Sequence, residues 1–223
     1  ALGLNAGGAR RLRIYASAET HTWLQKGADL SGVGTDAIRW IPTDDALRLD
    51  LAALRRAMAD DRANGDQAMM VVGTAGSVST GVVDPIGEIA AICREHGVWF
   101  HVDGAYGAFF MMTARGRAAM RGIERADSII LDPHKTLFLP YGTGGLLVRD
   151  ASALRRAHSL HAEYLPPMQN EDELVDFCEI SPELSRGFRG LRRTFGGSKL
   201  HLGNRRHAAG VADAAKRSGF DAG

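Results

Sequence analysis

Short apolar runs alternate along the chain with stretches whose apolar residues recur at helical spacing. Residues 67–73 form a nearly continuous apolar run, which is typical of a strand buried on both faces of a parallel sheet. Leu51, Leu54 and Met58 instead recur on one helix face, behind Asp50 as a capping residue. The same criteria predict further strands at 12–16, 37–41, 98–102, 128–131 and 144–148, and helices at 22–30 and from Asp84-Pro85 to Gly97. In the second of these helices, Asp84 is expected to be the cap and Pro85 the first helical residue. This alternation predicts an α/β fold, with a mostly parallel sheet covered by helices on both faces.

Polar residues follow four of the predicted strands. In sheets of this kind, ligands bind at the carboxyl ends of the strands, where the chain turns over the edge of the sheet. The polar segments at these ends are Ser17–His21, Thr74–Ser77, His101–Asp103 and Asp132–Lys135. The sequence therefore predicts that their side chains converge on one site.

An amine and a carboxylate stand at neighbouring strand ends. Lys135 follows the strand at 128–131 through an Asp-Pro break, with His134 beside it, where an amine can be desolvated and made nucleophilic. Asp103 follows the strand before it, where a carboxylate could keep a pyridine nitrogen protonated. This pair is what a pyridoxal phosphate site requires. The structural alternatives are a surface lysine and a helix-capping or loop carboxylate.

Other residues at these strand ends allow more than one interpretation. His101 and Asp103 could form a metal pair on one strand face, but no third ligand stands at a useful spacing, so no metal site is predicted. His21 either begins a helix or stacks its imidazole on a pyridine ring, where it could also move protons. Thr74 and Ser77 lie in a glycine-rich turn, which suits close approach to a ligand and an ordinary turn equally well.

Composition narrows the class of protein. A chain of 223 residues with 45% hydrophobic residues can bury a sizeable core in one large domain. The balance of 27 basic and 26 acidic residues gives no argument for a nucleic-acid or membrane partner. No apolar run reaches the ~20 residues that span a bilayer. Cys93 and Cys178 are too few for a disulfide scaffold, which predicts a reducing, cytoplasmic location. The absence of an initiator Met suggests a fragment.

Four motifs in this order resemble the group II pyridoxal-phosphate-dependent amino acid decarboxylases, which include aromatic-L-amino-acid and glutamate decarboxylases. The motifs are YASAETH at 15–21, TAGSVSTG at 74–81, HVDGAY at 101–106 and DPHK at 132–135. The resemblance implies a fold-type I transferase-like large domain over residues 1–195. It further implies that residues 196–223 form a helical segment leading to a small domain that the chain does not contain.

The resemblance also implies a role for each matching residue. Lys135 looks like the lysine that forms a Schiff base with pyridoxal 5'-phosphate, and Asp103 like the partner of its pyridinium nitrogen. Ala105 matches the small residue under the ring, His21 the stacking histidine and Thr74 the threonine beside the ring oxygen. In addition, His134 and Asp132 fall where the family places groups on the phosphate side.

Departures from the family pattern bear on activity. The family's Gly/Ser-rich phosphate-binding segment and its small domain, with a basic residue for the substrate carboxylate, are not found in this chain. Asp132 stands where many relatives carry Asn, and Thr136 where the family usually has Trp. Phe177 aligns with a catalytic tyrosine of the decarboxylases. Relatives with Phe at that position resemble aldehyde synthases.

The function that the resemblance implies is decarboxylation of an L-amino acid to an amine and CO2 through Lys135. One alternative is a decarboxylating aldehyde synthase or another pyridoxal-phosphate carbon–carbon lyase. A second alternative is a truncated domain without catalysis. The implied partners are a small amino acid substrate and a second copy of the chain, in a homodimer.

Overall fold

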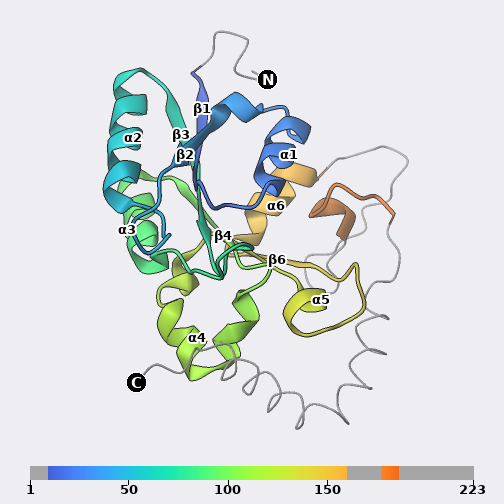
Figure 1. Cartoon of the computed structure of the whole chain (residues 1–223). Helices are drawn as coiled ribbons and strands as arrows, with labels where there is room; N and C mark the ends of the chain where they lie inside the picture. The colour runs from blue at the N-terminus through green and yellow to red at the C-terminus, as the bar shows by residue number, and fades with distance from the viewer. Residues whose placement is uncertain (1–9, 160–176, 186–223) are drawn as a thin grey trace, which may run out of the picture.

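A six-stranded sheet forms the centre of the molecule (Figure 1). The structure is a computed structural model that describes residues 10–159 and 177–185. The strands lie in the order β2-β1-β3-β4-β5-β6. Their bounds are β1 Leu12–Ser17, β2 Ile38–Ile41, β3 Gln67–Thr74, β4 Trp99–Asp103, β5 Ser128–Leu131 and β6 Gly145–Val148. Strands β1 to β5 pair in parallel, and β6 pairs antiparallel with β5. The predicted, mostly parallel sheet is therefore confirmed.

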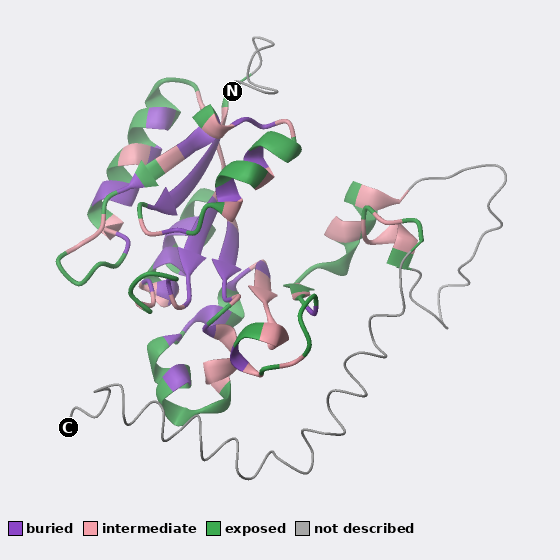
Figure 2. Ribbon diagram, turned by 45° about the vertical axis from the view of Figure 1, so that its right-hand side comes forward, coloured by how far each residue is buried: buried purple, intermediate pink, exposed green. Residues whose placement is uncertain are grey.

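Helices cover both faces of the sheet, as the alternating pattern predicts. Helices α2 (Leu51–Ala63) and α3 (Ile86–His96) lie on one face, and α1 (Trp23–Leu30) lies on the other (Figure 1). Tyr15 of β1 packs into the core under α2 and α3, whereas the next residue, Ala16, packs into the core under α1. Successive strand residues thus supply the two cores in turn. Figure 2 shows the buried strands between helices whose outer surfaces are exposed.

The ends of two helices follow from single residues. The Asp50 carboxylate accepts hydrogen bonds from the backbone N–H groups of Ala52 and Ala53 at 2.8 and 3.0 Å, which caps α2. Gly97 ends α3 in the left-handed conformation (φ 64°), which glycine adopts without strain. Both boundaries agree with the prediction.

The predicted role of Asp84 as a helix cap is wrong. Helix α3 begins after Pro85 without a side-chain cap, and the buried Asp84 carboxylate accepts from Leu49 N and Thr74 N, both at 2.8 Å. An Asp before a helical proline resembles a cap in sequence, but two distant backbone donors lie closer to the carboxylate in the fold. Asp84 therefore fastens the carboxyl end of β3 to the segment before α2.

The connection from β4 to β5 contains short helices that the hydrophobic pattern does not predict. They are η3 (Ala108–Met112), α4 (Ala114–Ala119) and η4 (Ile123–Arg125). Further short elements are η2 (Thr35–Ala37), α5 (Pro133–Thr136), α6 (Ala151–His158) and η5 (Phe177–Glu179). None of the helices in the described ranges has the length and apolarity needed to cross a bilayer. The domain boundary predicted at residue 195, and the helical segment after it, lie outside the described residues.

Candidate active site

The carboxyl ends of β3, β4 and β5 lie side by side. In the register of the sheet, Thr74 pairs with Asp103, and Asp103 pairs with Ile130 of β5. The loops beyond these ends are also joined, because Asp132 N donates to Ala105 O at 3.2 Å. The Thr20 hydroxyl, just past β1, lies 3.5 Å from the Thr74 hydroxyl. The fold therefore brings the predicted strand-end segments to one edge of the sheet.

Asp103 is a buried carboxylate without a cationic partner among the described residues. It is 7% exposed, and its Oδ2 accepts from the indole N–H of Trp23 at 2.6 Å. Its Oδ1 accepts from Ala105 N at 3.2 Å. No Lys or Arg side chain in residues 10–159 or 177–185 lies within ion-pair distance of it. A buried anion of this kind is costly unless a positive charge approaches it, so the position suits a cationic ligand atom.

Lys135 lies on the α5 turn that follows β5. Its Nζ is 3.1 Å from Asp132 Oδ2, and its side chain is 42% exposed, so the amine remains accessible. The Thr136 hydroxyl donates to Tyr106 O, which ties α5 to the loop after β4. The threonine that departs from the family's usual Trp thus fixes the lysine turn next to the Asp103 loop.

His134 and Asp132 lie beside Lys135 in the same segment. His134 Nδ1 donates to the backbone carbonyl of Thr143 at 2.6 Å, since a carbonyl can only accept. Its Nε2 lies 3.9 Å from Asp132 Oδ2. The phosphate-side roles implied for both residues stay predictions.

His21, Ala105 and Ser77 lie on the loops at the same edge. His21 is exposed, and its Nδ1 accepts from Trp23 N at 3.1 Å, which leaves the ring proton on Nε2 when the imidazole is neutral. Ala105 is partly buried beside Asp103. The Ser77 hydroxyl contacts the Thr80 hydroxyl at 2.6 Å and accepts from Thr80 N, so it stabilises its own turn.

Phe177 is not among the residues that the strand ends bring together. It lies on η5, which contacts α6 (Figure 1), and its side chain is half exposed. Its carbonyl accepts from the Ser181 hydroxyl at 2.7 Å. The implied role of Phe177 in place of a catalytic tyrosine stays a prediction.

His101 lies within hydrogen-bond distance of a buried hydroxyl. Its Nδ1 lies 2.8 Å from Ser128 Oγ, which also accepts from Trp99 Nε1 at 2.9 Å. No cluster of three or more His, Cys, Asp or Glu suited to a metal ion occurs among the described residues. His101 is thus part of the buried layer beneath Asp103.

Burial of His101 predicts a pH-dependent stability. Burial lowers the pKa of His101 from its usual value of 6.5, although the nearby Asp103 opposes this shift. The unfolded chain therefore binds an extra proton below pH 6.5, and the free energy of unfolding falls as the pH drops from 6.5 toward the folded-state pKa. Urea unfolding should show lower stability at about pH 5.5 than at about pH 7.5. The substitution His101→Gln should reduce this difference; an equal difference in both proteins would contradict the assignment.

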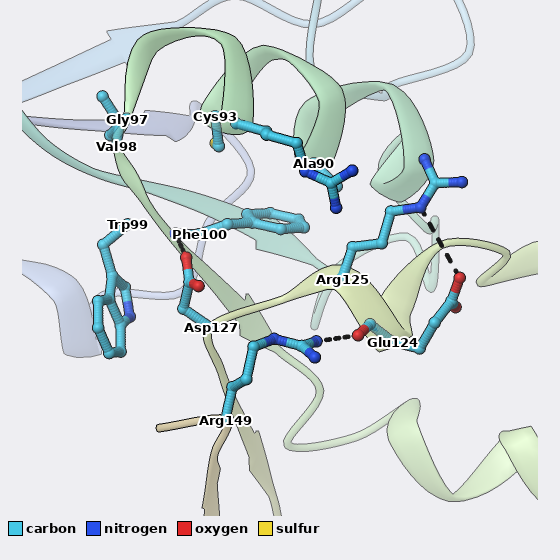
Figure 3. Close-up of a pocket in the computed structure, with 11 residues that line it drawn as sticks. Ala90, Cys93, Gly97, Val98, Trp99, Phe100, Glu124, Arg125, Asp127 and Arg149 are labelled. Carbon is cyan, nitrogen blue, oxygen red and sulfur yellow. Dashed lines mark hydrogen bonds and ion pairs between the residues drawn. The ribbon is translucent and has the colours of Figure 1, made fainter. Parts of the chain in front are cut away.

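A pocket of about 540 Å³ lies at the opposite edge of the sheet (Figure 3). It is bordered by the residues that precede β4 and β5 and by Arg149 after β6. Arg149 donates to the backbone carbonyls of Ala126 and Glu124, and Asp127 accepts from Phe100 N at 2.7 Å. Burial raises the pKa of the Cys93 thiol in its wall to about 12. Arg149 and Asp127 thus stabilise the loops around this pocket. The pocket lies away from the strand ends that carry Lys135 and Asp103.

The sequence pattern assigns no role to Trp23 and a wrong role to Asp84. Trp23 contacts both His21 and Asp103, and Asp84 holds the backbone of Thr74. A tryptophan two residues after the strand-end His21 is the only feature of the sequence that could have drawn attention to Trp23. Its contact with Asp103 spans 80 positions, so the sequence pattern does not reveal it.

Comparison with known proteins agrees with this architecture. The crystal structure of Oryza sativa TDC with PLP and tryptamine is 34% identical, with a TM-score of 0.79, over 90% of this chain and 43% of that one. The crystal structure of Rhodiola rosea 4-hydroxyphenylacetaldehyde synthase is 30% identical, with a TM-score of 0.76, over 89% of this chain and 41% of that one. The sheet and the strand-end site define a protein of the fold-type I pyridoxal-phosphate-dependent class.

The chain belongs to the pyridoxal-dependent decarboxylase family. Residues 5–196 match the model of the pyridoxal-dependent decarboxylase conserved domain. Aromatic-L-amino-acid decarboxylase of Bacillus atrophaeus is 37% identical over 180 residues, which are 80% of this chain and 38% of that protein. The resemblance in the four motifs is therefore confirmed. The chain spans less than half the length of these relatives.

The residues present fit the ring of pyridoxal phosphate. The buried Asp103 carboxylate lacks a cationic partner among the described residues, and a protonated pyridine nitrogen is a cation that could supply one. Lys135 presents an accessible amine at the adjoining strand end. The site thus offers a carboxylate for the ring nitrogen of the cofactor and an amine for its aldehyde group.

Proposed function

We propose that the chain is the cofactor-binding part of a pyridoxal-phosphate-dependent enzyme that decarboxylates an L-amino acid to an amine and CO2. The observation that carries this proposal is the buried Asp103 carboxylate, which has no cationic partner within residues 10–159 and 177–185 and lies beside the strand end that presents Lys135. Membership of the pyridoxal-dependent decarboxylase family supports the same conclusion.

The residues of the chain would divide the work. Lys135 would bind the cofactor's aldehyde carbon covalently and release it to the substrate amine. Asp103 would hold a proton on the ring nitrogen, while His21 would lie over the ring and Thr74 beside its oxygen. When bound, the cofactor would supply an electron-accepting ring for the pair left on the α-carbon as CO2 departs. The protein would contribute orientation, a fixed charge and exclusion of water.

A second product class has specific support. The aldehyde synthase of Rhodiola rosea is as similar in fold as several decarboxylases, and Phe177 stands where a catalytic tyrosine is expected. A phenyl ring has no hydroxyl with which to donate a proton to the α-carbon. The alternative function is therefore decarboxylation followed by oxidative deamination to an aldehyde, in which dioxygen would be the oxidant, reduced to hydrogen peroxide, and the amine nitrogen would leave as ammonia.

Cofactor uptake and product analysis test the proposal. Incubation with pyridoxal phosphate should give the visible absorption of a lysine-bound cofactor, and a panel of L-amino acids should then release CO2. An amine product would support the leading function and an aldehyde product the alternative. Absence of both cofactor uptake and CO2 release would leave the third candidate, a domain without catalysis.

We further propose a homodimer in the cytoplasm. The homodimer is what the family resemblance implies, and sedimentation of the chain at several concentrations tests it. The location is inferred from the low cysteine content of the sequence, in which Cys93 and Cys178 are the two cysteines. Fractionation of cells that express the protein tests the location.

A further inference from the structure

Trp23 contacts two of the residues predicted to hold the cofactor ring. Its backbone N–H donates to His21 Nδ1 at 3.1 Å, and its indole N–H donates to Asp103 Oδ2 at 2.6 Å. The first contact depends only on the main chain at the start of α1. The second depends on the indole N–H, which the side chains of phenylalanine and tyrosine lack.

The indole fixes the orientation of the Asp103 carboxylate. Asp103 Oδ1 accepts from Ala105 N at 3.2 Å, so each of the two oxygens has one donor and the plane of the carboxylate is defined. Each carboxylate oxygen can accept a second hydrogen bond. A ring nitrogen could therefore bind Asp103 without displacing Trp23.

The indole is itself held in place. Its ring meets the His101 ring edge-on, with centroids 5.6 Å apart and planes at 73°. His101 is fixed in turn by Ser128. On the α1 side, Gly27 lies beside the indole, where a methyl group would make an ordinary contact with Trp23 carbon atoms at 3.6 Å. The ring contact with His101 and the partial burial of Trp23 against the core under α1 restrict the positions open to the indole N–H.

We propose that Trp23 is a positioning residue that holds the Asp103 carboxylate ready for the ring nitrogen of pyridoxal phosphate. This inference rests on the proposed function, because it presumes that Asp103 meets that nitrogen. A carboxylate already oriented before binding loses less rotational freedom when the cofactor arrives, so the affinity for the cofactor is higher.

The substitution Trp23→Phe tests this role, because phenylalanine retains a ring for packing and lacks the N–H. It also retains the backbone contact with His21. The Kd for pyridoxal phosphate, measured from the absorption of the bound cofactor, should rise about tenfold, as expected for the loss of one hydrogen bond to a charged acceptor. The matched control Trp40→Phe removes a half-exposed indole from β2 and should leave the Kd unchanged.

A cofactor analogue separates positioning from packing. In 1-deazapyridoxal phosphate a C–H replaces the ring nitrogen, so Asp103 has no cation to meet. The Trp23→Phe chain and the unchanged chain should bind this analogue with equal Kd. An unchanged Kd for pyridoxal phosphate in Trp23→Phe, a lower one, or an equal loss with both cofactors would overturn the inference. Failure of the unchanged chain to bind either cofactor would instead refute the proposed function, and the inference with it.

Discussion

Replacing Asp84 with alanine is expected to lower the free energy of unfolding by about 2–5 kcal/mol. The substitution leaves the buried N–H groups of Leu49 and Thr74 without an acceptor, and each such group costs about 1–3 kcal/mol. Burial raises the pKa of Asp84, so part of this cost is offset by removal of a group that is unfavourable when charged. Urea unfolding at neutral pH measures the difference.

Two further variants make the expectation for Asp84 specific. Asp84→Asn keeps one acceptor oxygen and should lose less stability than Asp84→Ala. Asp50→Ala removes an acidic side chain that also accepts from two N–H groups, but at a helix start that is only partly buried, and should cost about 1 kcal/mol. Equal losses for Asp84→Ala and Asp50→Ala would show that the buried position of Asp84 has no special effect.

The substitution Gly107→Ala should be strongly destabilising, by about 3 kcal/mol, and should disturb the site itself. A Cβ at this position would lie 2.1 Å from the Ala75 carbonyl oxygen and 2.8 Å from its carbon. Because both atoms belong to the main chain, no side-chain rotation relieves the clash. The loops that follow Thr74 at the end of β3 and Asp103 at the end of β4 would have to separate.

Gly27→Ala is the matched control for this substitution. A Cβ there makes only ordinary contacts at 3.6 Å, inside helix α1, where alanine is favoured over glycine by about 0.5–1 kcal/mol. Thermal unfolding should therefore show a large loss for Gly107→Ala and no loss for Gly27→Ala. Comparable stability of the two variants would contradict the close approach of the two loops.

Much of the fold follows from local patterns. The apolar run at 67–73 and the helix behind Asp50 are both confirmed, because burial and capping depend on residues near in sequence. The short helices after β4 are not predicted, since their form depends on contacts such as the close approach of Gly107 to Ala75. Asp84 shows the same limit of local patterns, because its two donors come from segments 35 and 10 positions away.

Some residues of the candidate site could also be identified from the sequence, and others could not. Asp103 and Lys135 could be identified because each directly follows a strand, and strand ends of a parallel sheet share an edge. Trp23 could not, because it begins helix α1 whereas its partner lies at the end of β4, and only the packing of α1 on the sheet brings the two together. Phe177 is linked to the site by alignment alone. It lies on η5, which contacts α6, and its carbonyl accepts from the Ser181 hydroxyl.

The central claim is that Lys135 binds pyridoxal phosphate covalently. The chain contains four lysines, Lys26, Lys135, Lys199 and Lys216, so the site of attachment can be determined by peptide mapping. The chain is incubated with the cofactor, reduced with borohydride, digested and examined by mass spectrometry, beside a Lys135→Arg variant. The label is expected to be concentrated on Lys135 and to be lost in the variant. Labelling spread over the other three lysines, to the same extent in both proteins, would contradict it.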